Sequence, residues 1–372
     1  MFFITFSNLW SFSIFFFTSY LILLVSLITY LLPVLNNYTK YTVTKNKTYF
    51  TFINSFNIFY IIITPFILML IVLLLWSAPT VSVWFGHVVF TSFQYKMFIF
   101  ILLNTIVYYC IFTSVNYFSS REVYDYTIVS FHFVYWILLL FASNTLFSVV
   151  FLIEVIGALL FLLIITSTFS TGFFYNNLNL NYGHLFQNVT PYPLLQSILY
   201  LFWISLISSL NLFVFILFFY FKLLTFDWYL VEYIFLYFIN TSSFKELFTL
   251  SIYWFIILLC IFVKCGIAPF YIWKPTFFKG LPVYTLFFYI TFFYFHFYLF
   301  IINFLVVYLS QLFYFYLGVF WLLIISGLMV LLMIMCESYY LKIFLAISSI
   351  LNSLLVFLIL TSPHFIDTLF II

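Results

Sequence analysis

The stretch FVKCGIAPFYIWKPTFFKGLPV, residues 262–283, decides how the rest of the chain is interpreted. Lys264 stands inside a hydrophobic run, and Gly266, Pro269 and Pro275 follow it closely. A proline inside a helix removes a backbone hydrogen bond, and glycine weakens the helix further. In lipid, such backbone is tolerated only where it lines a polar cavity. The stretch therefore predicts a discontinuous helix with a lysine beside an ion pathway.

The composition of the whole chain indicates which solvent surrounds that helix. Of its 372 residues, 67% are hydrophobic and 5% are charged, which leaves too little polar surface to cover a water-soluble globule. Long apolar segments separated by short polar ones indicate a helical bundle. We therefore expect an all-α polytopic membrane protein. The net charge of +3 is small and scattered, so nucleic acid is not expected as a partner, whereas membrane lipid is.

Hydrophobic patterning predicts about ten spanning helices. Their expected ranges are 9–35, 52–76, 95–118, 127–143, 146–168, 193–221, 247–273, 283–309, 312–335 and 342–362. Within the connection 222–246, the segment FDWYLVEYIFLYF predicts a helix that lies in the membrane interface. Four cysteines show no metal-ligand spacing, and no metal site follows from them.

Two charged residues fall well inside predicted spans, Glu154 and Lys264. Charged groups in such positions are costly and face a partner, a cavity or water. One interpretation is structural, either an ion pair that locks two helices or a carboxyl kept neutral by burial. The other is a proton-handling pair, because burial and mutual attraction move the pKa values of both groups. The sequence leaves both interpretations open.

The remaining charges are expected at helix ends or in connections, where long side chains reach the interface. Alternating sides across ten spans gives seven basic residues on one face and three on the other. The positive-inside rule then assigns the richer face to the cytoplasm or matrix. That face carries Lys40, Lys45, Lys47, Arg121, Lys274, Lys279 and Lys342.

Four stretches in register resemble one family, the antiporter-like membrane subunits of respiratory complex I. They are residues 84–103 (WFGHVVFTSFQYKMFIFILL), 122–163 (EVYDYTIVSFHFVYWILLLFASNTLFSVVFLIEVIGALLFLL), 262–282 and 339–358 (YYLKIFLAISSILNSLLVFL). The likeness spans about 80–360. It implies an antiporter-like fold with a discontinuous seventh helix, and it places Glu154 and Lys264 on the family's proton-handling glutamate and lysine.

The resemblance also implies a function and a setting. The subunit would translocate protons while the complex oxidises NADH and reduces ubiquinone, in the mitochondrial inner membrane. The excess of Phe and Tyr in the composition separately suggests an AT-rich organelle gene. The subunit would bind no cofactor itself, because NADH, FMN, the iron–sulfur clusters and ubiquinone are bound elsewhere in the complex. Its partners would be other membrane-arm subunits. Two alternatives are a cation/proton antiporter subunit and a structural membrane-arm scaffold that no longer pumps.

The implied domains are an N-terminal three-helix unit at 1–120, a five-helix repeat at 121–310 and the start of a second repeat at 311–372. The family plan has four further helices, which we expect on a separate polypeptide. The family also carries an eighth-helix lysine fourteen residues after the glycine matched by Gly280, a position that Tyr294 occupies here. His296 is the candidate replacement, but two residues turn an α-helix by about 200°, so a π-bulge or insertion would be needed. His132 is expected to be a core histidine.

Overall fold

The protein is a multi-pass, predominantly helical membrane protein. The computed structural model describes residues 20, 24, 53–75, 81–83, 86–113, 120–178, 192–241, 244–267, 269–281, 283–304, 316–336 and 340–360. Within these residues, seven helices are long and apolar enough to cross a membrane. They are Ser92–Ile111, Leu146–Thr166, Leu195–Leu223, Lys245–Cys265, Thr285–Asn303, Leu317–Cys336 and Leu341–Leu358.

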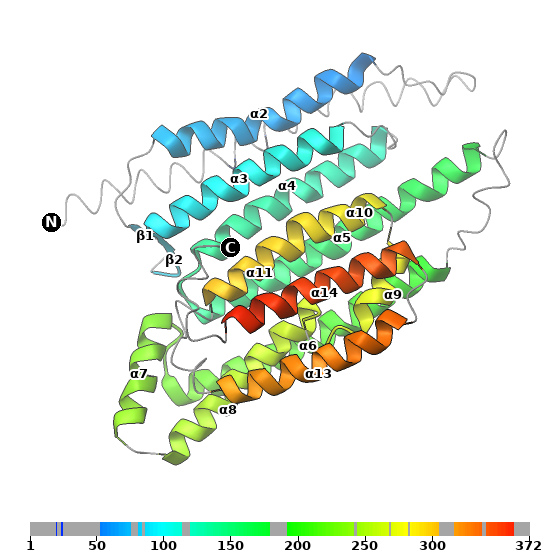
Figure 1. Cartoon of the computed structure of the whole chain (residues 1–372). Helices are drawn as coiled ribbons and strands as arrows, with labels where there is room; N and C mark the ends of the chain where they lie inside the picture. The colour runs from blue at the N-terminus through cyan, green and yellow to red at the C-terminus, as the bar shows by residue number, and fades with distance from the viewer. Residues whose placement is uncertain are drawn as a thin grey trace. The chain divides into compact units, whose positions relative to one another are not determined.

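The chain divides into two compact units, Met1–Phe174 and Tyr175–Ile372. Figure 1 labels the elements of both. The first unit holds α2 (Ile53–Leu75), β1 (Val81–Val83), β2 (Val88–Phe90), α3 (Ser92–Thr113), α4 (Ser120–Ala142) and most of α5 (Leu146–Leu178). The second holds α6 (Tyr192–Leu223), α7 (Trp228–Asn240), α8 (Phe244–Cys265), α9 (Trp273–Gly280), α10 (Val283–Phe288), the π-helix η1 (Tyr289–Tyr294), α11 (Phe295–Asn303), α13 (Leu317–Cys336) and α14 (Leu341–Leu360).

In the first unit, a short antiparallel hairpin holds the turn between α4 and α5. Val81 pairs with Phe90 and Val83 with Val88, and Gly86 supplies the positive φ of +90° that the hairpin turn requires. The Asn144 amide donates to the His87 carbonyl at 2.8 Å, and its side chain donates to the Gly86 carbonyl at 3.1 Å. The start of α5 is therefore fixed by backbone and side-chain hydrogen bonds to the hairpin.

Paired hydroxyl groups join α3 to α4 inside the same unit. The hydroxyls of Tyr108 and Tyr126 lie 2.9 Å apart, and those of Tyr109 and Ser130 lie 2.6 Å apart. All four side chains are buried. Burying a hydroxyl without a partner costs free energy, so matched pairs across the helices specify the register of α3 against α4.

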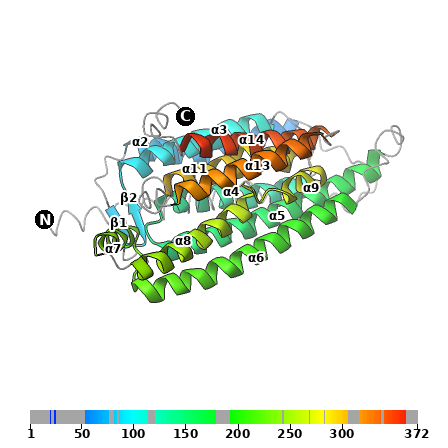
Figure 2. The ribbon, with the colours of Figure 1, turned by 60° about the horizontal axis from the view of Figure 1, so that its bottom comes forward.

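In the second unit, α6 packs along α8 and α9, and α14 packs against both α13 and α9. Figure 2 shows α6 and α8 running side by side. Aromatic rings fill the contacts of α8, where Phe262 meets Phe320 of α13 at 6.3 Å and Phe357 of α14 at 5.0 Å between ring centroids. Phe262 thus packs α8 against both neighbouring helices.

The predicted spans are confirmed in part. Helices occupy nine of the ten predicted ranges, and the first range, 9–35, lies outside the described residues apart from Tyr20 and Leu24. The range 247–273 is not one helix, because α8 ends at Cys265. The segment expected as an interfacial helix forms α7, which runs across the direction of α8 in Figure 1. The predicted domain boundaries at 120 and 310 stay predictions.

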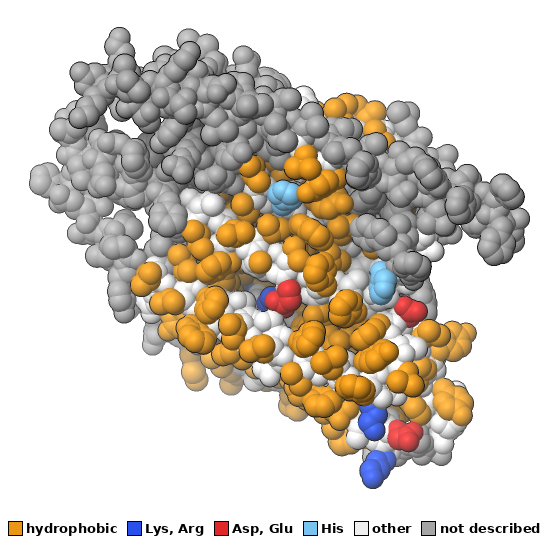
Figure 3. All heavy atoms as spheres, turned by 180° about the vertical axis from the view of Figure 1, so that it is seen from behind, with side chains coloured by type: hydrophobic (Ala, Val, Ile, Leu, Met, Phe, Trp, Pro, Cys, Tyr) orange, Lys and Arg blue, Asp and Glu red, His pale blue; other side chains and the backbone are white. Residues whose placement is uncertain are grey.

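Large apolar side chains remain exposed along several helices. Figure 3 shows apolar side chains over much of the described surface on one face, with charged side chains scattered among them. On α6 the exposed set includes Leu199, Trp203, Leu210 and Phe221. A soluble protein rarely exposes so much contiguous apolar surface, whereas lipid covers it without cost.

Candidate functional site

The end of α8 is a tight reversal built on Gly266. The Ile267 amide donates to the Phe262 carbonyl at 3.0 Å, and the Gly266 amide donates to the Val263 carbonyl at 3.3 Å. These two bonds with a φ of +65° at Gly266 form a Schellman motif, the common glycine-terminated helix end. Helix α8 therefore ends at Cys265, directly after Lys264.

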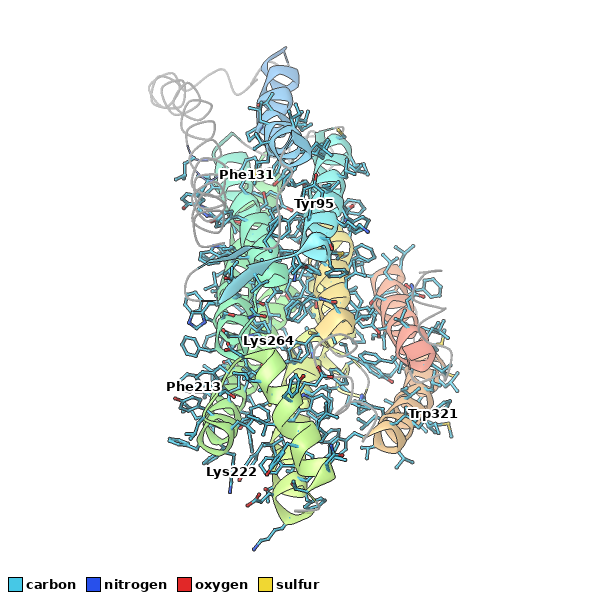
Figure 4. The ribbon with its side chains drawn as sticks, turned by 90° about the vertical axis from the view of Figure 1, so that its left-hand side faces the viewer. Tyr95, Phe131, Phe213, Lys222, Lys264 and Trp321 are labelled. Atoms are coloured by element: carbon cyan, nitrogen blue, oxygen red, sulfur yellow. The ribbon has the colours of Figure 1, made fainter. Side chains whose placement is uncertain are left out.

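Lys264 occupies the last turn of α8 and is 9% exposed. Figure 4 shows Lys264 at the end of α8 away from Lys222 of α6. Lys264 therefore stands at a helix C-terminus, directly before the break. The partial negative charge of that terminus stabilises a cation. The structure places the predicted lysine at the break that the sequence indicated.

The cause of the break differs from the predicted one. Pro269 lies in the connection between α8 and α9, four residues after α8 has ended, so it removes no hydrogen bond from that helix. Gly266 ends the helix instead. Pro275 lies in the first turn of α9, where a missing amide costs little because that amide has no partner within the helix.

The chain restarts as α9 with a lysine turned into the protein. Lys274 is 0% exposed, and its Nζ atom lies 3.4 Å from the centroid of the Tyr294 ring and 5.8 Å from that of Phe278. Among the described residues its Nζ has no hydrogen-bond partner. Desolvation lowers the pKa of Lys274 well below its usual value, and the neighbouring Cys265 thiol opposes this in part.

Lys274 was missed by the sequence prediction, which assigned it to the water-facing lysines of a connection. That assignment is wrong, because α14 and η1 cover this part of α9. A signal was available in the short helix itself. Trp273, Lys274, Phe277 and Phe278 follow helical spacing and are all buried, so the lysine stands on the apolar face of α9.

Glu154 lies in α5, within the candidate span Leu146–Thr166, and is partly exposed. The start of α5 is capped by Thr145, whose hydroxyl accepts from the Ser148 amide at 3.3 Å, while the Ser148 hydroxyl accepts from the Thr145 amide at 3.3 Å. This reciprocal arrangement is a capping box. Glu154 thus stands between two and three turns beyond a firmly held helix start.

His296 is buried in α11, directly after the π-helix η1. A π-helix closes its turns over one extra residue, so η1 shifts the register of the residues after it by about 100°. This is about half of the 200° that the prediction required, so the replacement of the family's lysine by His296 stays a prediction. The His296 Nδ1 atom lies 2.7 Å from the Phe292 carbonyl of the preceding turn. The Tyr294 ring, in contrast to His296, lies against the Lys274 amine.

His132 is half-buried, so it is not the core histidine that the sequence suggested. Its ring lies 6.0 Å from that of Tyr20. Within the described parts of the chain, no three His, Cys, Asp or Glu side chains gather as metal ligands would. No model of a known protein family matches the sequence, and neither does any curated protein.

Proposed function

We propose that the chain is an antiporter-like, proton-translocating membrane subunit of respiratory complex I, of the subunit 2 type. The observation that carries the proposal is the lysine at the break. Lys264 occupies the last turn of α8, the chain reverses at Gly266, and it restarts as α9, in a protein with seven candidate spans among its described residues. A nearly buried ammonium at interrupted backbone is typical of an ion pathway in a membrane protein.

The proposed role of Lys264 follows from its surroundings. Lys264 is nearly buried, and the partial negative charge of the α8 C-terminus lies beside it. In the proposed cycle, quinone reduction elsewhere in the complex changes the local field, and Lys264 takes up and releases one proton through water.

Glu154 is the proposed second proton-handling group. It stands in a candidate span that carries no other charged residue, where a charged group is rare and commonly functional. The predicted electrostatic coupling of Glu154 to Lys264 is part of the proposal. If the two groups titrate together, the double variant loses no more transport than the more damaging single variant.

Purification of the native particle in mild detergent tests the setting of the chain. We expect mass spectrometry to find NADH-oxidising and iron–sulfur subunits with it, and to reveal whether a small hydrophobic protein accompanies them. Particles without redox subunits would favour a free-standing cation/proton antiporter instead.

Lys264→Met then tests the residue role in particles reconstituted into liposomes. We expect assembly to persist while NADH-driven proton transport falls to below about a tenth, since a positioned proton-transfer group commonly contributes a hundredfold or more. Lys245→Met, an exposed lysine at the other end of α8, is the matched control. Normal pumping by assembled Lys264→Met would favour a scaffold that does not pump.

Glu154→Gln removes the ionisable group and keeps the shape of the side chain. The expected result is again assembly with reduced transport. Glu246→Gln, in the exposed first turn of α8, provides the control. Unchanged transport and turnover in Glu154→Gln would remove this residue from the mechanism.

A further inference from the structure

Lys274 differs in its surroundings from the two other lysines of the same region. Lys342 donates to the Leu281 carbonyl at 2.6 Å, and Lys279 is exposed with its Nζ 4.6 Å from the centroid of the Tyr340 ring. Lys274 is fully buried, and its Nζ atom lies over the ring face of Tyr294 without a hydrogen-bond partner among the described residues. A cation over an aromatic face recovers less free energy than burying an ammonium costs.

The backbone of Gly266 makes room for this lysine. A Cβ at Gly266 would lie 3.3 Å from the Lys274 Cδ atom and 3.0 Å from the Trp273 Cζ2 atom. The stem of Lys274 therefore packs against the residue that ends α8. Lys264 in the last turn of α8 and Lys274 in the first turn of α9 thus stand on either side of the turn at Gly266.

Other polar atoms near Lys274 also lack partners among the described residues. The Trp273 Nε1 atom and the Tyr289 hydroxyl are buried and have no hydrogen bond there. Trp273 precedes Lys274 in α9, and the Tyr289 ring lies 5.5 Å from that of Phe278 and 6.4 Å from that of Tyr294. The Tyr289 ring thus belongs to the same aromatic surroundings as Lys274. Buried polar atoms without protein partners are commonly satisfied by internal water, which needs two to four such partners.

Three other titratable groups on the elements around α9, those of Tyr294, Lys342 and Lys222, either have a hydrogen-bond partner or are exposed. Tyr294 donates its hydroxyl to the Ser349 carbonyl of α14 at 3.2 Å, which holds its ring over the Lys274 amine. On the other elements packed against α9, α14 carries Lys342, already bound to Leu281, and α6 carries Lys222, which is exposed.

We propose that Lys274 is a second proton-carrying lysine, which receives a proton from Lys264 through water at the α8–α9 turn. The ammonium of Lys264 gives one proton to a water molecule, a proton passes to the lone pair of Lys274 Nζ, and the Lys274 ammonium releases it to water at η1. No bond other than N–H and O–H changes, and no oxidant is required. The inference rests on the proposed proton transport and adds a residue to it.

Lys274→Met and Lys274→Arg are measured in the reconstituted particle, with Lys279→Met as the control on the same helix. Arginine keeps the charge but does not deprotonate in proteins. We expect both Lys274 variants to assemble and to lose most NADH-driven proton transport, while Lys279→Met retains it. Full transport in assembled Lys274→Met, or its rescue by Lys274→Arg, would overturn the proposal in favour of a structural role.

Thermal stability distinguishes a functional Lys274 from a structural one. Removing a structural cation would lower the dissociation temperature of the particle. Replacing a buried, unpartnered ammonium with an apolar side chain is neutral or stabilising. We therefore expect Lys274→Met to raise or preserve the temperature at which the particle dissociates on a native gel. A marked decrease would contradict a purely functional lysine.

A measurement on the unaltered protein keeps the proposal testable if the variants do not assemble. Amine acylation at a series of pH values, located by mass spectrometry, should give a lower pH midpoint for Lys274 than for exposed Lys279. Equal midpoints, or no acylation of Lys274 at any pH, would overturn the proposal. Loss of transport in Lys264→Met with normal transport in Lys274→Met would refute this inference alone, whereas normal transport in Lys264→Met would refute the proposed function itself.

Discussion

Two turns between helices, one in each unit, reverse the chain with different sets of contacts. At the α4–α5 turn, Asn144, Thr145 and Ser148 exchange hydrogen bonds with one another and with the β-hairpin. At the α8–α9 turn, the reversal depends on Gly266, and the Lys274 Nζ atom just beyond it is buried without a hydrogen-bond partner among the described residues. The first turn has the features of a structural joint, and the second holds a buried amine without a hydrogen bond among the described residues.

The two turns differ in how much their polar groups contribute to stability. A turn used only for packing gains from satisfying each polar group, because buried unpaired groups are costly. A turn that must hold a proton and release it cannot bind its amine too firmly. The two turns can therefore be separated by substitutions whose effects on stability differ in size.

The largest effect is expected from alanine substitutions at three glycines: Gly266 at the α8–α9 turn, Gly86 in the hairpin that holds the α4–α5 turn, and Gly318 in α13 as the control. Gly266→Ala adds a Cβ 3.0 Å from Trp273 at a positive φ and should destabilise by roughly 2–5 kcal/mol. Gly86→Ala meets no atom within 4 Å but has a φ of +90°, so about 1–2 kcal/mol is expected. Gly318→Ala has neither problem and should be neutral or slightly stabilising.

The series is measured as the temperature at which the particle dissociates on a native gel. The predicted order is Gly266→Ala lowest, then Gly86→Ala, then Gly318→Ala. Equal temperatures for Gly266→Ala and Gly318→Ala would show that the α8–α9 turn does not need its left-handed residue.

A middle-sized effect is expected where a lysine of the second unit has a partner. Lys342→Met removes the amine that donates to the Leu281 carbonyl at the end of α9. Loss of this charge-assisted hydrogen bond should lower the stability by about 1.5–3 kcal/mol. Lys279→Met removes an exposed ring contact and should change stability by less than about 1 kcal/mol. The same dissociation temperature reports both, and a larger loss in Lys279→Met would reverse this ranking.

The smallest effect is expected at the well-bonded turn of the first unit. Thr145→Val removes the cap of α5 and the 2.9 Å contact with His87, which should cost about 1 kcal/mol. Thr166→Val is the control, because its hydroxyl bonds only to the Leu163 carbonyl of its own helix among the bonds described. Hydrogen exchange of the Ser148 amide should accelerate in Thr145→Val, and unchanged exchange would count against the capping role.

Much of the candidate site could be predicted from the chain alone. Glu154 and Lys264 stand out in any apolar bundle, since a charge in a long hydrophobic run is rare and costly. The stretch around Gly266 also predicts a break. It does not predict which residue ends the helix, because glycine and proline both interrupt helices and only the hydrogen bonds of Phe262 and Val263 show that α8 ends before Pro269.

What the sequence by itself determined is the membrane class, most of the helix ranges and the two charged residues inside them. These follow from hydrophobicity and residue spacing, which are local properties. Only the tertiary structure decided the burial of Lys274, its approach to Tyr294 and the π-helix that sets the register of His296. The physical reason is that burial depends on neighbours distant in sequence: the lysine of α9 is enclosed by η1 and α14, and no local pattern specifies their positions.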